Sequence, residues 1–182
     1  MEDMANQIFG KITSYNIFNN LFPGITFCSA LSRLTRFNIT ADSILEQLFV
    51  WYFVGVIISR IGSIFVEGLL KKIKVKGKPY LVFAEYKEYT EASKSNPFIE
   101  TLSEANNTYR TIISLLICTG IVYLYDTLLY DMVVEYCAFL NYIVAIIVWI
   151  FLIILFIISY KKQTNYIKKQ VEKHINEKNS QK

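Results

Sequence analysis

Long runs of apolar residues alternate with short polar stretches along this chain. The longest run extends from Cys137 to Ser159 and contains no charged side chain. At about 1.5 Å per helical residue it reaches roughly 34 Å, and the hydrocarbon core of a bilayer is about 30 Å thick. A helix of a small soluble domain would carry a polar stripe, which this run lacks. The run therefore predicts a transmembrane helix.

Two further runs are long enough to cross a bilayer. Leu48 to Leu70 is interrupted by Arg60 near its centre and by Glu67 near its end, and Thr111 to Leu129 carries one acid, Asp126. An arginine at mid-helix costs about 2.5–3.5 kcal/mol on the insertion scale, whereas the Leu, Ile, Val and Phe residues around Arg60 together return roughly 4–8 kcal/mol. Insertion of both runs is therefore predicted.

The earliest apolar segment, Tyr15 to Leu34, is interrupted by three asparagines and by Pro23-Gly24. A proline removes a backbone hydrogen bond and kinks a helix, which membrane helices tolerate when neighbouring groups satisfy the freed carbonyl. We interpret the segment as a kinked first span. A re-entrant segment or an amphipathic helix lying in the interface is the alternative.

Basic residues set the predicted orientation. Lysines concentrate in Lys71 to Lys78 and in the tail from Lys161, whereas Asp126 to Glu135 has no lysine or arginine. The positive-inside rule places both lysine-rich stretches in the cytoplasm. The predicted fold class is thus an all-α membrane protein with four transmembrane helices, both termini in the cytoplasm and the third helix extended into the cytoplasm. The predicted division is membrane helices 1 and 2 in 1–71, a cytoplasmic helical excursion in 72–107, membrane helices 3 and 4 in 108–160, and a basic cytoplasmic tail in 161–182.

The predicted cytoplasmic excursion contains a helix start. Gly77 and Pro79 break regular structure, and Asn96 can cap a helix whose first position is Pro97. No proline or glycine follows until Gly120, so a helix from Pro97 to about Tyr130 is expected, with its first third outside the membrane. The residues expected to form a partner platform are aromatic or basic: Tyr80, Phe83, Tyr86, Lys87 and Tyr89.

Arg60 is the strongest functional candidate, because ionisable groups at membrane depth usually face a bundle interior or water and require a partner. Glu67 or Asp126 could be that partner. Gly55, Ser59 and Ser63 recur every four positions on the same helix, a spacing that permits close helix approach and suggests an assembly face. Three alternatives stay open: an ion pair within one chain, a polar lining shared between subunits, and tight helix contact without access to water.

Composition argues against an enzyme. Hydrophobic residues make up 53% of the chain, and the only histidine, His174, lies in the polar tail, so no histidine-based metal cluster or Ser-His triad is expected. Phosphate-binding and dinucleotide-binding glycine motifs are absent from the sequence.

The cysteines Cys28, Cys118 and Cys137 are widely spaced in apolar surroundings and suggest no disulfide framework. We expect no cofactor and no metal. The net charge of +4 does not argue for nucleic-acid binding, which we regard as unlikely.

Three segments together resemble small multi-helix membrane proteins of bacteria: NNLFPGITF (Asn19 to Phe27), WYFVGVIISRIGSIFVEGLLKK (Trp51 to Lys72) and LSEANNTYR (Leu102 to Arg110). The chain resembles the membrane subunits of antiviral defence systems, such as the Kiwa membrane protein or the accessory membrane proteins of RNA-targeting CRISPR loci. The resemblance implies a membrane protein that works with a cytosolic component recognising nucleic acid. It transfers no individual functional residue.

These patterns lead to one preferred hypothesis: a non-enzymatic, multi-pass protein of the bacterial inner membrane that self-associates and displays a cytoplasmic platform. The expected partners are a second copy, a cytosolic protein, and anionic lipids at the lysine clusters. The alternative is a homo-oligomeric pore that alters membrane permeability, with Arg60 and Ser59 near the conduction path. A simple membrane anchor for another gene product is a third possibility.

Overall fold

The computed structural model describes the backbone of residues 16–136 and 138–180, and the side chains of residues 16–133 and 143–175. The fold is all-α, with 84% of residues in helices, as predicted. The helical segments, including three short π-helical ones labelled η, are η1 (Ile17–Leu21), α3 (Phe22–Leu34), α4 (Ile44–Ile61), η2 (Gly62–Val66), α5 (Glu67–Lys72), α6 (Tyr86–Ser95), α7 (Phe98–Leu124), η3 (Tyr125–Leu129), α8 (Tyr130–Tyr136) and α9 (Ala138–Ser180).

Three helices in the described part of the chain are long and apolar enough to cross a membrane: Ile44–Lys72, Phe98–Val133 and Ile143–Ile175. They confirm that the runs predicted around Leu48 to Leu70, Thr111 to Leu129 and Cys137 to Ser159 belong to helices that could span a membrane. Only 28%, 17% and 11% of their most apolar windows are buried within the chain, so their side chains mostly face outward, as in a lipid solvent. The η1–α3 helix is shorter and is not one of these three.

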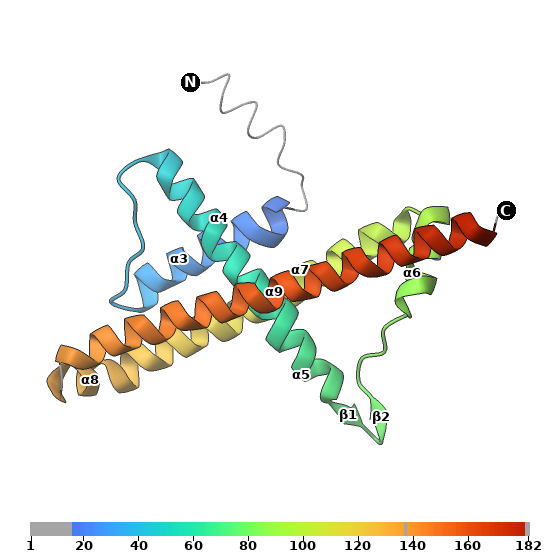
Figure 1. The fold of residues 1–182 in the computed structure, drawn as a ribbon. Helices are drawn as coiled ribbons and strands as arrows, with labels where there is room; N and C mark the ends of the chain where they lie inside the picture. The colour runs from blue at the N-terminus through green and yellow to red at the C-terminus, as the bar shows by residue number, and fades with distance from the viewer. Residues whose placement is uncertain (1–15, 137, 181–182) are drawn as a thin grey trace.

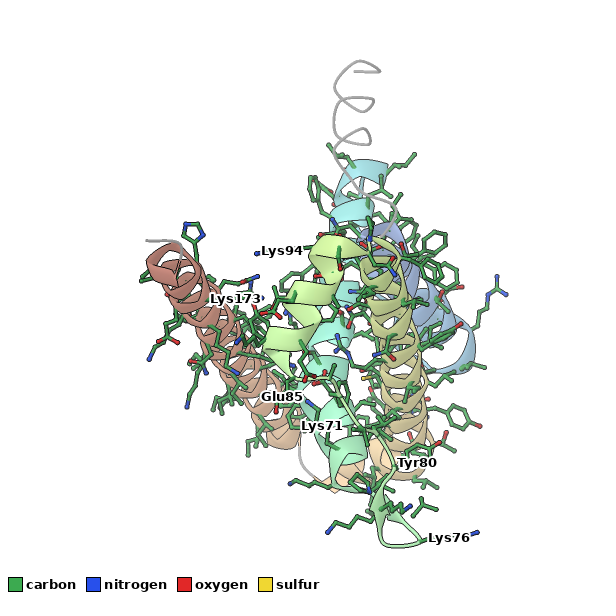
Figure 2. All side chains as sticks on the ribbon, turned by 90° about the vertical axis from the view of Figure 1, so that its right-hand side faces the viewer. Lys71, Lys76, Tyr80, Glu85, Lys94 and Lys173 are labelled. Carbon is green, nitrogen blue, oxygen red and sulfur yellow. The ribbon has the colours of Figure 1, made fainter. Side chains whose placement is uncertain are left out.

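The helices form three layers. Figure 1 shows the α4–η2–α5 helix crossing the directions of α7 and α9. From the side, α9 lies on one face of this central helix and α7 on the other (Figure 2). The η1–α3 helix packs against α4 and α7. The central helix can therefore bring side chains from α7 and α9 together.

Two glycines set the closest helix contact. A Cβ built on Gly55 would lie 1.6 Å from the carbonyl oxygen of Asn20, and one built on Gly24 would lie 1.7 Å from that of Trp51. The backbones of η1–α3 and α4 thus touch at both positions, the close approach that small residues permit between membrane helices. The neighbouring Pro23 lies at the start of α3, directly after the wider π turn of η1.

The segment predicted as a helical excursion is helical only in part. After α5 the chain forms a short hairpin of β1 (Lys74–Val75) and β2 (Lys78–Pro79), with a turn of positive φ at Lys76 and Gly77. Such a two-residue turn suits the twist of a hairpin. Val82 and Phe83 follow in a non-helical stretch, so the prediction of a helical excursion is wrong for the residues before Tyr86.

The helix start predicted at Pro97 is confirmed. The backbone N–H of Phe98 donates to Asn96 Oδ1 at 3.1 Å, and α7 begins there. The helix then continues through η3 and α8 to Tyr136, beyond the predicted end near Tyr130. The tail is helical as well, because α9 continues from the last span to Ser180.

Candidate functional site

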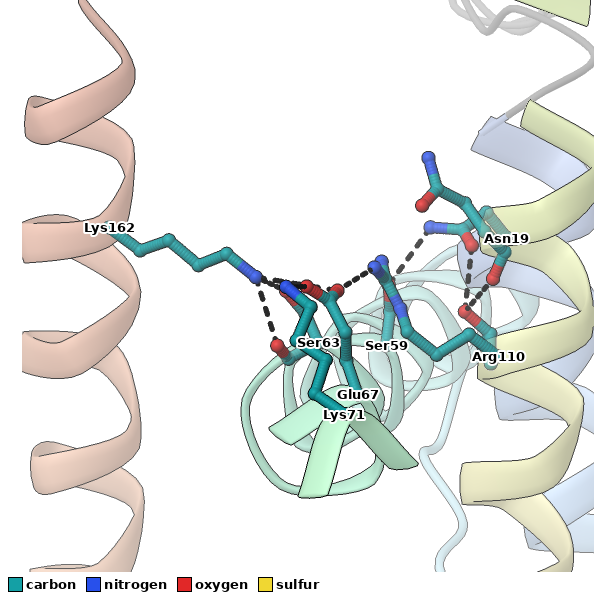
Figure 3. Close-up of polar contacts among 9 residues, drawn as sticks. Asn19, Ser59, Ser63, Glu67, Lys71, Arg110 and Lys162 are labelled. Carbon is teal, nitrogen blue, oxygen red and sulfur yellow. Dashed lines mark hydrogen bonds and ion pairs between the residues drawn. The ribbon is translucent and has the colours of Figure 1, made fainter. Parts of the chain in front are cut away.

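Polar side chains from four helices meet where the central helix passes between α7 and α9 (Figure 3). They form two adjoining groups. The hydroxyl–amide cluster consists of Asn19, Ser59, Thr111 and Ser114, and the ion cluster consists of Ser63, Glu67, Lys71, Arg110 and Lys162.

The hydroxyl–amide cluster is buried and internally satisfied. Asn19 donates from Nδ2 to Ser59 Oγ at 2.9 Å and accepts at Oδ1 from the Thr111 hydroxyl at 2.7 Å. Ser114 donates to the backbone carbonyl of Ile58 at 2.8 Å. Thr111 and Ser114 are fully buried. Hydrogen bonds between side chains in such surroundings fix helix register, because breaking one leaves a polar group without a partner in an apolar interior.

The ion cluster gathers three cations around one carboxylate. Glu67 Oε2 lies 2.6 Å from Arg110 Nη1 of α7 and 3.5 Å from Lys162 Nζ of α9, while Oε1 lies 2.7 Å from Lys71 Nζ. Lys162 also donates to the hydroxyl and the carbonyl of Ser63, at 2.8 and 2.9 Å. Figure 3 shows Lys162 and Arg110 reaching Glu67 from opposite sides. Glu67 thereby ties all three long helices together.

A second ionic contact lies at the far end of the helices. Arg36, in the connection between α3 and α4, pairs through Nε with Asp126 at 3.0 Å and through Nη1 with Asp131 at 2.5 Å. Its guanidinium also lies 4.3 Å from the centre of the Tyr130 ring. The hydrogen bond to Asp131 raises the pKa of Arg36, so the guanidinium stays charged. This contact fixes the α3–α4 connection to η3 and α8.

Arg60 does not meet either predicted partner. Glu67 is engaged by the three cations of the ion cluster, and Asp126 is engaged by Arg36. Arg60 is exposed on the central helix, and within the described residues it makes no ion pair or side-chain hydrogen bond. The ion pair within one chain, the first of the three alternatives for Arg60, is therefore wrong. The π turn of η2 lies between Arg60 and Glu67 and changes which side chains share a face, so the two do not meet as they would on a regular helix.

The small-residue stripe is used within the chain. Gly55 contacts the backbone of Asn20, Ser59 binds Asn19, and Ser63 accepts from Lys162. All three residues of the stripe thus meet other helices of the same molecule. Its spacing marks a packing seam within the chain and not the predicted assembly face for a second copy.

The predicted platform residues divide between two environments. Tyr86 of α6 stacks on Tyr166 of α9 with ring centres 5.7 Å apart, and Lys173 lies 3.6 Å from Glu91 and donates to the carbonyl of Lys87 at 3.3 Å. Tyr89 is partly buried. Tyr80 and Phe83 are exposed, with relative exposures of 60% and 45%, although Lys71 Nζ lies 4.3 Å from the Phe83 ring centre.

Sequence patterns missed Arg36 of the second ionic contact and several members of the two clusters: Asn19, Thr111, Ser114, Arg110 and Lys162. A usable signal existed for two of them. Arg110 directly precedes the apolar run that begins at Thr111, and Lys162 closely follows the run that ends at Ser159. Both cations flank predicted spans, as Lys71 does. No such signal marked Asn19.

The described residues contain no group of three or more His, Cys, Asp or Glu side chains placed to hold a metal ion. The clusters offer charge pairing and hydrogen bonding between helices. Comparison with known proteins leaves this picture unchanged, since no family model, no curated protein and no solved structure matches the chain.

Proposed function

We propose that this chain is a non-enzymatic, multi-pass protein of the bacterial inner membrane that self-associates and presents a cytoplasmic platform to a cytosolic protein. The observation that carries the proposal is the docking of α6 on the polar end of α9. The platform is defined as residues 72–110 together with the tail from Lys161. Its bacterial setting and its role in antiviral defence rest on the resemblance described above.

The proposed topology has four crossings, with η1–α3 as the first. Ile17–Leu34 would extend about 27 Å as a helix, close to the thickness of the hydrocarbon core. The Arg36 contact supports this arrangement, because it joins the α3–α4 connection to the loop end of α7. The ion cluster lies at the opposite ends of the apolar runs of the three long helices. The lysine distribution favours the cytoplasm for that side.

Docking of α6 supports an ordered platform. The Tyr86–Tyr166 stack and the Lys173–Glu91 pair join α6 to α9 across more than seventy residues of sequence. Figure 2 shows α6 between α7 and α9, with Glu85 at its start. A partner would therefore meet a preformed surface and would not have to order it on binding.

Exposed apolar side chains flank α6 on both sides in the sequence. Tyr80, Val82 and Phe83 precede it, and Phe98 and Leu102 follow it, with relative exposures between 45% and 83%. In the proposed topology none of them faces lipid. Apolar side chains exposed to water in numbers are typical of protein-binding surfaces.

Site-specific photocrosslinking in cells tests the platform. A photoreactive amino acid at Val82 or Phe98 is expected to capture one cytosolic protein, and the same group at Phe49, on the central span, is expected to capture none. Capture that is equal at all three positions, or absent at both platform positions, would contradict the platform.

Self-association is supported by Arg60. Its charge lies exposed on a span, and a charged side chain facing lipid is costly. In a helix, the Cα–Cβ bond tilts toward the N-terminus, which directs Arg60 away from the nearer, cytoplasmic end of the span. A second copy can supply the missing polar contact. Arg60→Leu is therefore expected to reduce self-association of labelled protein in liposomes, measured by energy transfer, and unchanged transfer would contradict this role.

The same residue favours a second candidate, a homo-oligomeric pore. Ser59 is buried in the hydroxyl–amide cluster, so of the two residues predicted near the conduction path Arg60 is the one that could line it at contacts between copies. Expression in cells carrying a voltage-sensitive dye separates the candidates. Depolarisation that Arg60→Ala abolishes would favour the pore, and an unchanged potential would favour the platform.

A further inference from the structure

The ion cluster carries an unbalanced charge. Lys71, Arg110 and Lys162 face a single carboxylate, Glu67, which is the only acid within ion-pair distance of them among the described residues. The cluster therefore has a formal excess of two positive charges. The Nε–H of Arg110 is also buried without a hydrogen-bond partner in the described part of the chain.

The three cations share one level relative to the apolar runs. Lys71 ends the central span, Arg110 immediately precedes the apolar run of α7, and Lys162 follows that of α9. Their side chains retain relative exposures of 46%, 20% and 30%, so they are partly desolvated and still reachable. This level is where an apolar helix leaves the hydrocarbon core and meets the phosphate layer of a leaflet.

We propose that the ion cluster is a binding site for an anionic phospholipid of the cytoplasmic leaflet, whose phosphate groups neutralise the excess charge. Arginine and lysine are the side chains that bind phosphate, and basic pockets between spans bind multiply charged headgroups. A lipid with two phosphates, such as cardiolipin, matches an excess of two charges. The side of the membrane rests on the topology proposed above.

The surroundings favour a lipid over a free anion. Leu69, Ile113 and Ile158 lie two, three and four residues from the nearest cation of the cluster and are apolar side chains with relative exposures of 63%, 40% and 39%. A lipid bound by its headgroup at the cluster can lay its acyl chains along such side chains, which removes apolar surface from contact with water or detergent. A free phosphate would gain only the ionic contacts.

Lipid binding can be measured on the purified full chain in detergent by native mass spectrometry, with cardiolipin, phosphatidylcholine and pyrophosphate as probes. Wild-type protein is expected to retain cardiolipin in preference to phosphatidylcholine. Lys162→Gln removes one cation of the cluster and should weaken cardiolipin retention about tenfold, the loss expected for one charged hydrogen bond. Lys161→Gln, the adjacent exposed lysine, is the matched control and should leave retention unchanged.

Three results would overturn the proposal. Equal loss with Lys161→Gln would indicate attraction to surface charge in general. Displacement of cardiolipin by an equal concentration of pyrophosphate would indicate a site for free anions. Unchanged retention in Lys162→Gln would place the lipid elsewhere. The detergent solution contains neither a membrane with two faces nor a cytosolic partner protein. These results therefore do not depend on the proposed topology or on the platform.

Discussion

At the scale of single residues, two glycines decide how closely the first helix approaches the central helix. Gly55 and Gly24 have no room for a Cβ, because a backbone oxygen occupies its position in each case. A side chain at either position must push the helix backbones apart. The effect would spread to Asn19, whose hydrogen bonds to Ser59 and Thr111 depend on the same contact.

Gly55→Ala is accordingly expected to destabilise the protein by at least about 2 kcal/mol, a typical cost of overpacking a well-packed interior. The measurement is thermal unfolding of purified protein in detergent. Gly68→Ala and Gly120→Ala are matched controls, since a Cβ on either glycine meets nothing within 4 Å. Equal effects at all three positions would contradict the close contact.

Glu67 is the second decisive residue, because it is the one acid that holds three cations near each other. Glu67→Gln would leave Lys71, Arg110 and Lys162 facing one another. We expect the free energy of unfolding to fall by roughly 2 kcal/mol. This is less than the full cost of breaking a buried ion pair, because the cations are partly exposed. Glu100→Gln, on the exposed start of α7, is the control. Equal unfolding temperatures for Glu67→Gln and Glu100→Gln in the same thermal assay would contradict this role of Glu67.

At the scale of elements, each π-helical segment accompanies a polar contact. Asn19 lies in η1, and Asp126 is buried in η3. Ser63 lies in η2, the segment that ends directly before Glu67. A π turn adds a residue to the helical turn and changes which side chains face a neighbouring helix. Hydropathy cannot predict such turns, because tertiary contacts decide where they form. For this reason the sequence pattern located the spans and some of their polar residues, such as Ser59 and Glu67, but missed the partners of these residues.

The element that tests the platform most simply is α6. Tyr86→Ala removes its stack on Tyr166 and should release α6 from α9. Hydrogen exchange of the amides in Tyr86–Ser95 is then expected to accelerate by at least about tenfold, which corresponds to a loss of about 1.4 kcal/mol of local stability. Tyr109→Ala removes an exposed tyrosine of α7 and should leave this exchange unchanged. Equal exchange in both variants would show that the stack does not hold α6.

At the scale of the whole molecule, the sequence predicted the class of fold well and the partners of individual side chains poorly. Apolar run length identified the three helices that are long enough to span a membrane, and Asn96 with Pro97 identified the start of α7, because both signals are local. The partner of Arg60 and the role of the Gly55, Ser59 and Ser63 stripe depend on which helices become neighbours. That depends on tertiary packing, which run length and spacing do not encode.

The central claim is that the lysine-rich hairpin and the tail share the cytoplasmic side of a membrane. Single cysteines at Lys76, Lys168 and Thr40, in a variant lacking the native cysteines, can be labelled with a membrane-impermeant maleimide. We expect positions 76 and 168 to react only in inverted vesicles and position 40 only in intact spheroplasts. Labelling of positions 76 and 168 from opposite sides, or of all three positions from the same side, would contradict the account.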